Sequence, residues 1–335
     1  MQRKNFVVLI IFVTSIFLST LVFAINAISN KSVNHISQNS TVKIYKFTRA
    51  FGKNGTNNGQ FGLHNGPYGI AIDHANNVYV TDYDNNRVQK FDSNGKFITK
   101  WGDEGSKNGQ FLNPQSIAVD SNSKIFVTDV FNNRVQKFDS NGNFITKWIS
   151  PLKEHYKKHS SLDGITIDHA NNVYVTDYDN NRVQKFDSNG KFITKWGDGG
   201  NGNGQFDDPQ SIAVDSSGNV YVSDYSLNRV QKFDSNGNFI TKWGDEGSKN
   251  GQFDGPRGIA VDSSGNVYVS DYKNNRVQKF DSNGNFITKW GEKGSNYGQF
   301  DGPIDITIGS TGNVYVSDQG NVRIQIFSPI PIHGK

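Results

Sequence analysis

The stretch from Gly258 to Trp290 decides the fold; it reads GIAVD, SSGN, VYVSD, YKNN, RVQKF, DSNG and NFITKW. Runs rich in β-branched and aromatic residues alternate in it with short groups of Gly, Asn, Asp and Ser, which is the pattern of strands joined by tight turns. We expect four antiparallel strands in each such stretch. Val267 and Val269 lie on one face of the second strand and Tyr268 on the other, so neighbouring sheets must cover both faces.

The same module recurs about every 47 residues, in six copies. Five copies end in Trp, whereas the sixth stops at Phe327. A separate segment before the first copy, KFTRAFG at 46–52, matches KFITKWG at 96–102. A closed ring needs such a split module and a linear solenoid does not. We therefore predict an all-β fold, a six-bladed β-propeller with four antiparallel strands per blade, closed by an N-terminal strand that completes the last blade.

The composition agrees with a single domain of short strands. The chain has 335 residues with 35 Gly and 8 Pro, and 13% of its residues are aromatic. The repeat predicts a propeller over residues 42–328, followed by a tail at 329–335. Residues 28–41 are polar, with many Ser and Asn, and are expected to form a flexible spacer. The absence of cysteine excludes disulfides and thiol catalysis.

An apolar run at residues 6–25, preceded by Arg3 and Lys4, indicates a membrane-targeting segment within residues 1–27. Two outcomes remain open, a cleaved signal peptide and a retained N-terminal membrane anchor. Because the positive charges precede the run, both place the rest of the chain outside the cytoplasm, as a secreted or membrane-anchored protein. Sequons, relevant only if the cell glycosylates exported proteins, occur at Asn30, Asn39 and Asn54.

The net charge gives no indication of nucleic-acid binding. The chain carries 35 Lys and Arg against 31 Asp and Glu, a net charge of +4. Without Arg3 and Lys4 the net charge is +2. An exported ring of this charge lacks the excess of basic residues that phosphate contacts require.

The modules resemble the NHL repeats of six-bladed β-propellers over nearly the whole chain after residue 42. The resemblance is carried by PRGIAVD at 256–262, VYVSD at 267–271 and NNRVQKF at 274–280, in six copies in register. It implies a narrow central channel lined by the first strand of each blade, with binding on a face built from inter-blade loops. Propellers of this family occur as interaction modules, RNA-binding domains and a few enzymes, so the resemblance does not select a function.

Residues that recur in every blade are assigned to the framework. Each module has an Asp five residues before an Arg, as in Asp271 and Arg276, and a sixfold pair predicts a structural bond rather than a catalytic one. The Asp at the end of the first strand, as in Asp262, is expected to cap the following turn. DSNG at 92–95 resembles the start of a calcium loop, but it lacks the bidentate Glu and occupies a hairpin position, so a turn is predicted.

No catalytic residue, metal site or cofactor is predicted. The first strands, such as IAI at 70–72 and IAV at 259–261, offer no metal ligand. The loop from Ile149 to Leu162 interrupts the repeat and contains His155 and His159, spaced as two ligands on a helical turn. Because no third ligand is near them in the sequence, a solvated basic loop is preferred, although the loop is unique to one position.

Positions that vary among the copies are the candidate binding residues, because copies one and three are identical over 73–103 and 168–198. One variable set follows the Pro that opens each blade, and the other follows the Asp of the second strand. From these sets we predict ligand-binding residues around one mouth of the channel, namely Tyr68, Gln115, Gln210, Arg257, Tyr83, Tyr178, Tyr225 and Tyr272. Tyr and Arg bury large areas and still form hydrogen bonds. The alternative is that the Tyr side chains merely cover neighbouring blades.

These observations favour a monomeric, non-enzymatic, extracytoplasmic propeller that binds or scaffolds a protein, peptide or glycan through its inter-blade loop face. The N-terminal segment adds the membrane as a partner if it is retained. The alternative function is a lyase or hydrolase with a metal-assisted site at the channel mouth. Binding is preferred because the channel strands offer no catalytic group.

Overall fold

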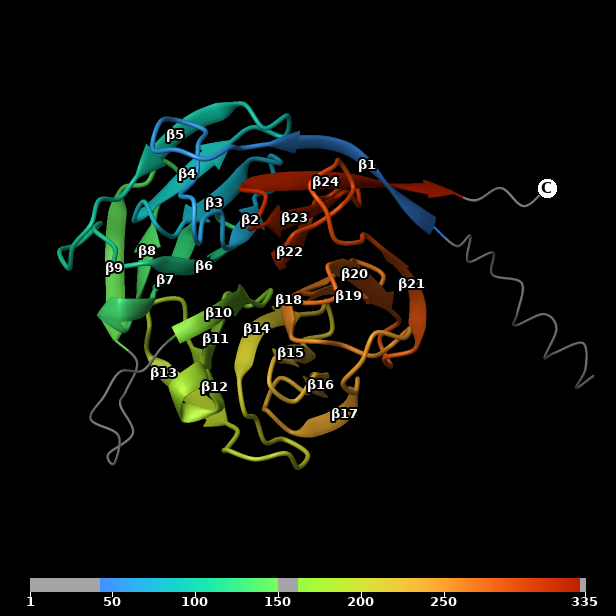
Figure 1. Ribbon diagram of the computed structural model, residues 1–335. Coiled ribbons are helices and arrows are strands. Elements are labelled where there is room, and N and C mark those ends of the chain that lie inside the picture. Colours follow the sequence, from blue (N-terminus) through green and yellow to red (C-terminus); the bar gives the residue numbers. More distant parts are fainter. Residues whose placement is uncertain (1–42, 150–161, 332–335) are drawn as a thin grey trace, which may run out of the picture. The chain divides into compact units, whose positions relative to one another are not determined.

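Six four-stranded antiparallel sheets are arranged around a central channel (Figure 1). The computed structural model describes residues 43–149 and 162–331, and within these ranges Ile44–Ile330 form one compact unit. Several sequence-based predictions lie outside the described residues. They are the targeting segment, the spacer with Asn30 and Asn39, and the loop with His155 and His159.

The strands of blades 1 to 5 follow the module in chain order. Blade 1 contains β2 (Ile70–Ile72), β3 (Val78–Asp82), β4 (Arg87–Phe91) and β5 (Phe97–Trp101). Blade 2 contains β6 (Pro114–Val119), β7 (Ile125–Asp129), β8 (Arg134–Phe138) and β9 (Phe144–Ile149). Blade 3 contains β10 (Leu162–Ile167), β11 (Val173–Asp177), β12 (Arg182–Phe186) and β13 (Phe192–Trp196). Blade 4 contains β14 (Pro209–Val214), β15 (Val220–Asp224), β16 (Arg229–Phe233) and β17 (Phe239–Trp243), and blade 5 contains β18 (Pro256–Val261), β19 (Val267–Asp271), β20 (Arg276–Phe280) and β21 (Phe286–Trp290).

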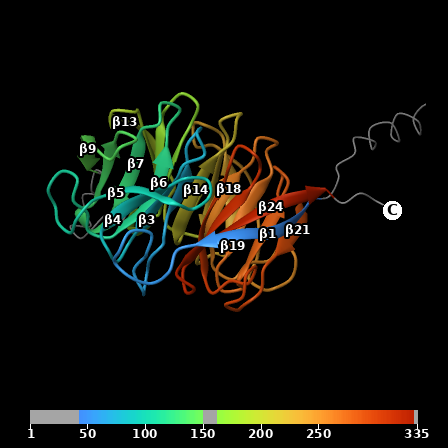
Figure 2. The same ribbon diagram turned by 90° about the horizontal axis from the view of Figure 1, so that it is seen from above.

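The N-terminal strand closes the ring, as predicted. Blade 6 contains β22 (Pro303–Ile308), β23 (Val314–Asp318) and β24 (Arg323–Pro331), and its fourth strand is β1 (Lys43–Phe51). β1 runs along β24 in both views of the ring (Figures 1 and 2). It also contacts both adjacent blades. Tyr45 stacks on Trp290 of blade 5 with ring centroids 4.4 Å apart, and Phe51 packs on Phe91 of blade 1 with centroids 4.8 Å apart.

Each sheet packs its apolar residues against both neighbouring sheets. The second strands are buried along their whole length. Tyr79 of blade 1, for example, joins Phe111 and Val127 of blade 2 in one core cluster. The Trp that ends blade 1, Trp101, reaches Phe138 of blade 2 at a centroid distance of 5.9 Å. Burial on both faces explains why the strands have apolar residues at consecutive positions instead of alternating ones.

A bulge at the start of the first strand directs side chains toward one mouth of the channel. In blade 5, Pro256 pairs with Asp271 and Ile259 with Val269, so three steps along β18 match two along β19. The same irregularity occurs in blades 2, 3, 4 and 6. Bulges bend a strand and re-aim its side chains, and here they affect the variable residue that follows the opening Pro.

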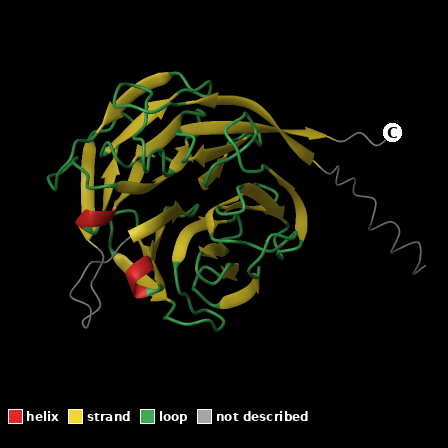
Figure 3. Ribbon diagram, viewed as in Figure 1, coloured by secondary structure: helices red, strands yellow, loops and turns green. Residues whose placement is uncertain are grey.

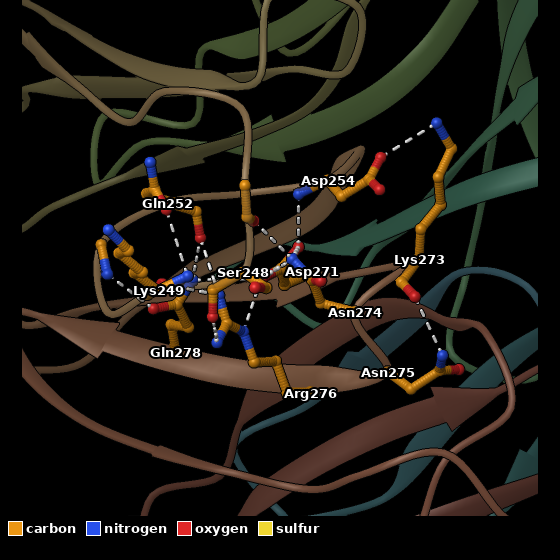
Figure 4. A network of polar contacts seen from close by, with 12 residues as sticks. Ser248, Lys249, Gln252, Asp254, Asp271, Lys273, Asn274, Asn275, Arg276 and Gln278 are labelled. Atoms are coloured by element: carbon orange, nitrogen blue, oxygen red, sulfur yellow. Dashed lines mark hydrogen bonds and ion pairs between the residues drawn. The ribbon is translucent and has the colours of Figure 1, made fainter.

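The repeated Asp and Arg form a buried structural pair, as predicted (Figure 4). In blade 5, Arg276 Nε donates to Asp271 Oδ2 at 2.7 Å, and the guanidinium also donates to the carbonyl oxygens of Ser248, Lys249 and Gln252. Asn274 Nδ2 donates to both Asp271 oxygens at 3.0 Å. The pair therefore fixes the loop that enters the blade, and corresponding ion pairs occur in blades 1, 2, 3 and 6. The prediction fails in blade 4, where Arg229 Nε has no acceptor among the described residues.

Two short 3-10 helices, η1 (Val130–Asn132) and η2 (Tyr178–Asn180), follow the second strands of blades 2 and 3 (Figure 3, red). Each helix begins at the variable position that follows the Asp of the second strand, Val130 in η1 and Tyr178 in η2. Of the helices in the described ranges, neither has the length and apolar character needed to cross a membrane.

Candidate functional site at the channel mouth

The central channel is lined by the first strands of the six blades. The first strands, β2, β6, β10, β14, β18 and β22, enclose a cavity of about 200 Å³ lined mainly by Ile, Val, Ala and Thr. Within residues 43–149 and 162–331, no group of three or more His, Cys, Asp or Glu side chains could hold a metal ion. The chemistry available to a ligand lies at the end of the channel, where the variable residues gather.

The residue that precedes the first Ile of each blade belongs to a ring that lines a small cavity of about 20 Å³. Glycine alternates there with a polar residue: Gly69, Ser116, Gly164, Ser211, Gly258 and Asp305. The glycines are required because a Cβ at Gly69 would lie 2.4 Å from the carbonyl oxygen of Gln115 in the next blade. The polar residues bond to the following blade, and Ser116 Oγ accepts the N–H of Ile165 at 3.3 Å.

Asp305 takes the third polar place in this ring. Its Oδ2 accepts the N–H of Ile70 in blade 1 at 3.0 Å, and its Oδ1 accepts the N–H of Ile306 at 2.9 Å. It therefore makes the same inter-blade bond as the two serines but brings a carboxyl group to the lining of the channel. Burial raises its pKa to about 6.

Above this ring the channel widens into a hollow of about 330 Å³, which we call the mouth pocket. Seven of the eight predicted binding residues line it, and Tyr225 does not. The complete lining is Asn65, Tyr68, Tyr83, Gln115, Val130, Phe131, Asp163, Tyr178, Gln210, Arg257, Tyr272 and Gln319. The two variable sets, which are separated in the sequence, thus share one concave surface built from all six blades.

The floor of the mouth pocket is a chain of hydrogen bonds that crosses the channel. Arg257 Nη1 donates to the hydroxyl of Tyr68 at 2.8 Å, and Gln115 Nε2 donates to the same hydroxyl at 3.1 Å. Gln115 Nε2 also donates to Asp163, which is only 8% exposed. Residues from four blades, 1, 2, 3 and 5, are joined in this way. These hydrogen bonds hold the floor residues in place and use part of their hydrogen-bonding capacity.

Arg257 is held between two aromatic rings. Its guanidinium carbon lies 4.6 Å from the ring centroid of Tyr272 and 5.1 Å from that of Tyr225. Gly255 permits this packing, because a Cβ there would lie 2.5 Å from the Tyr225 ring. Tyr225 thus packs against Arg257 without lining the mouth pocket. This matches the alternative expectation that a Tyr at this position covers a neighbouring blade.

The floor combines one cation, Arg257, with the carboxyl group of Asp163, whose pKa is raised. Burial raises the pKa of Asp163 well above its usual range, against the opposing effect of Arg257, and the nearby Asp208 and Asp305 raise it further. Burial also raises the pKa of Tyr68, so its hydroxyl keeps its proton at neutral pH. The floor therefore presents Arg257 as its single cation, beside a buried carboxyl group and a phenol.

Tyr83 and Tyr178 lie higher on the wall and are more accessible than the floor. Tyr83 stacks on Tyr68 with centroids 5.5 Å apart, and Tyr178 is 40% exposed. Phe131 is 60% exposed and was missed by sequence reasoning, because it follows the variable position and is exposed through helix η1. Asp163 and Asp305 were also missed as site residues. Each was visible as the one acid at its position among six copies.

Comparison with family models agrees with this architecture. A model described as 6-bladed beta-propeller matches residues 67–154 and 160–246, more than half of the chain, and the NHL repeat model matches 253–280 and 300–327. The chain belongs to the family of six-bladed β-propellers built from NHL repeats. No protein with a curated description matches it in sequence.

Solved structures share the fold at low sequence identity. A catalytically inactive virginiamycin B lyase from Staphylococcus aureus, solved with quinupristin, is 18% identical with a TM-score of 0.59, over 87% of this chain and 90% of that one. A gluconolactonase from Xanthomonas campestris is 13% identical with a TM-score of 0.61, over 86% and 100%. A Bacteroides thetaiotaomicron protein of unknown function is 17% identical with a TM-score of 0.67, over 86% and 76%. At these identities the likeness concerns the fold alone.

Proposed function

We propose that this chain is a non-enzymatic binding propeller that holds part of a glycan or peptide in the mouth pocket. The observation that carries the proposal is the convergence of seven variable residues on one hollow of about 330 Å³, while the repeated residues form the framework. Variation gathered on one concave surface is expected when a fixed scaffold presents a specific site.

The chemistry of the wall supports a polar ligand with flat apolar faces. Tyr83, Tyr178 and Phe131 provide aromatic surfaces, and Gln210 and Gln319 provide amides that both donate and accept. Sugar rings and peptide side chains offer such faces together with hydroxyl or amide groups. Aromatic side chains often contribute a large share of the binding energy at such sites.

Binding to arrays of immobilised oligosaccharides and peptides tests this function. The full-length protein is compared with Tyr83→Ala and Tyr178→Ala, which remove wall rings without breaking the hydrogen bonds of the floor. Tyr297→Ala is the matched control, because Tyr297 is 70% exposed and stacks on Phe47 away from the mouth pocket. We expect roughly tenfold or greater loss of affinity in the two wall variants only. Equal binding by all four proteins would remove the mouth pocket as the binding site.

A second candidate, a lyase or hydrolase at the channel mouth, is favoured by one feature. Asp163 and Asp305 are carboxyl groups with raised pKa values beside the same hollow, a pattern common in acid–base sites. Zn²⁺ or Ca²⁺ bound in a one-to-one ratio by the purified protein, and lost in Asp163→Asn, would favour a metal-assisted enzyme. Binding of an array ligand without metal and without its conversion would favour the binding propeller.

The proposal places the propeller outside the cytoplasm, on the strength of the apolar run at 6–25 and the charges that precede it. Digestion of intact cells by an added protease measures this directly. We expect the added protease to digest the propeller on intact cells. If the propeller is fully protected from the protease until the cells are lysed, this location is contradicted.

A further inference from the structure

The turn after the first strand encloses a carboxylate in four blades. In blade 4, Asp215 Oδ1 accepts the N–H groups of Ser217 and Asn219, each at 2.9 Å. Asp215 Oδ2 accepts Asn219 Nδ2 at 2.8 Å and the hydroxyl of Tyr221 at 3.0 Å. The same four donors surround the corresponding residues of blades 1, 3 and 5, namely Asp73, Asp168 and Asp262.

Blade 6 retains the donors and lacks the carboxylate. Gly309 stands at the Asp position, and the corresponding donors are the N–H groups of Thr311 and Asn313, Asn313 Nδ2 and the hydroxyl of Tyr315. The turn keeps its shape, because Gly309 N–H donates to the Asn313 carbonyl at 2.9 Å, as Asp215 N–H does to Asn219 at 3.0 Å. Among the described residues none of the four donors has a hydrogen-bond acceptor.

The positive charge near this position is also retained, but it comes from another strand. In blades 1 to 5 a Lys of the third strand lies over the ring at the Tyr315 position, as Lys232 does over Tyr221 at 5.0 Å. Blade 6 has Ile326 instead, and the cation that lines the same cavity as Tyr315 is Arg49 of β1, whose Nη1 donates to Asn94 Oδ1. Burial nevertheless raises the pKa of Tyr315, so its hydroxyl remains a donor at neutral pH.

A cavity of about 300 Å³ opens where the carboxylate is missing. It is lined by Arg49, Thr311, Asn313 and Tyr315, with Asn76 and Asn94 of blade 1 on the far side, and we call it the closure pocket. Tyr315 is 4% exposed and lies at the base of this pocket, whereas Asn313 is half-buried and both Thr311 and Arg49 are exposed. It is at the opposite end of the blades from the mouth pocket, because the first strand of each blade runs from the mouth to this turn.

We propose that the closure pocket binds the carboxylate of a small, polar organic acid. The ligand's two oxygens take the places that the Asp oxygens occupy in the other blades, where they accept two backbone N–H groups, an amide and a phenol. The guanidinium of Arg49 compensates the negative charge of the bound carboxylate. The remaining volume, lined by hydroxyl and amide groups, accommodates a few further polar atoms.

The test measures binding of acetate and glycolate to the full-length protein by ligand-observed NMR and by thermal melting, at constant ionic strength in chloride. Gly309→Asp supplies the missing carboxylate from the chain itself; its Cβ would meet Tyr315 at 3.4 Å, an ordinary contact. We expect this variant to lose acid binding and to melt at a higher temperature. Ser263→Asp, at the corresponding turn of blade 5, adds the same charge without filling the pocket and should bind like wild type.

A second variant keeps the test decisive if Gly309→Asp fails to fold. Tyr315→Phe removes one donor and should weaken binding roughly tenfold, the usual effect of losing a hydrogen bond to a charged group. No binding by wild type, or equal binding by wild type and Gly309→Asp, would overturn the proposal. A blocked dipeptide carrying one Asp tests a carboxylate presented by a polypeptide. If the dipeptide binds and neither acetate nor glycolate does, the assignment to a small acid is overturned.

Discussion

Asp305 shows how one substitution in a repeat changes the chemistry of the ring without changing its bonding. Blades 2 and 4 have Ser at this position, and the Ser hydroxyl and the Asp carboxyl each accept the N–H of the next blade's first strand. The carboxyl, however, belongs to a half-buried residue deep in the ring, where its charge is poorly solvated. Its folded-state pKa of about 6 lies above the ordinary value of 3.8. The folded protein therefore binds this proton more tightly than the unfolded chain does.

Asp305→Ser should reduce the pH dependence of stability. Because the folded-state pKa is raised, the stabilising contribution of Asp305 is fully present below pH 3.8 and is lost as the pH rises through 6. We expect wild type to lose more stability than the variant between pH 5 and pH 8, by about 1–3 kcal/mol, measured by urea denaturation. Asp139→Ser is the control, since hydrogen bonds from Asn143 lower the pKa of Asp139 and it does not titrate in this range. Identical slopes for wild type and Asp305→Ser would contradict the assignment.

At the scale of the element, one turn sequence adopts two conformations. Tyr83–Asn85 in blade 1 and Tyr178–Asn180 in blade 3 lie in identical stretches, yet the first is a turn and the second is the 3-10 helix η2. In blade 1 the N–H groups of His64 and Asn65, from an inserted loop, both donate to Asp84 Oδ2 at 2.8 Å. Local sequence cannot distinguish the two blades, because the contact made in blade 1 comes from residues outside the identical stretch.

Repetition among the six copies decides what the sequence could predict of the fold and the site. Strands, ring closure and the Asp–Arg pairs were predictable because each is repeated, so that a local pattern and its packing partner recur together. The residues around the mouth were predictable as a set because they vary within a fixed frame. The crossing bonds among Tyr68, Arg257 and Asp163 were not, because they join blades far apart in the sequence and depend on side-chain reach across the channel.

Blade 4 contains an element-scale defect that one substitution should repair. Leu227 replaces the Asn that donates to the framework Asp in the other five blades. Asp224 instead accepts backbone N–H groups at 3.2 Å, its pKa is raised by burial to about 6, and the buried Nε of Arg229 has no acceptor within the described part of the chain. Leu227→Asn should stabilise the protein by about 1 kcal/mol at pH 8, measured by urea denaturation.

The reciprocal substitution provides the control for this repair. Asn274→Leu removes the corresponding donor from Asp271 of blade 5 and should destabilise the protein. The stabilisation by Leu227→Asn should be largest above pH 6. This follows because the raised pKa of Asp224 means that its unfavourable effect grows as the carboxyl ionises. If both substitutions destabilise the protein, the packing of Leu227 contributes more to stability than the missing hydrogen bonds to Asp224 would.

At the scale of the whole molecule, β1 joins three blades. It completes the sheet of blade 6, while Tyr45 accepts Lys279 Nζ at 3.2 Å and shares a hydrogen bond of 2.6 Å with Tyr268, both in blade 5. At its other end Phe51 covers Gly95 and Phe91 of blade 1. The closure pocket lies on this joint and includes Arg49 of the same strand. Closure and occupation of that pocket are therefore expected to be linked, since both depend on β1 remaining in place.

Deletion of residues 42–52 tests whether β1 holds the ring closed. Without it, β24 becomes a free edge of nine residues, and the aromatic partners of Tyr45 and Phe51, namely Trp290 and Phe91, become exposed. Exposed edges and apolar surface promote pairing between molecules. We expect a lower melting temperature and sedimentation as oligomers, whereas Tyr297→Ala, which removes an exposed ring that stacks on β1, should remain close to wild type in both measurements. A monomeric deletion variant with an unchanged melting temperature would show that the other strands suffice to hold the ring.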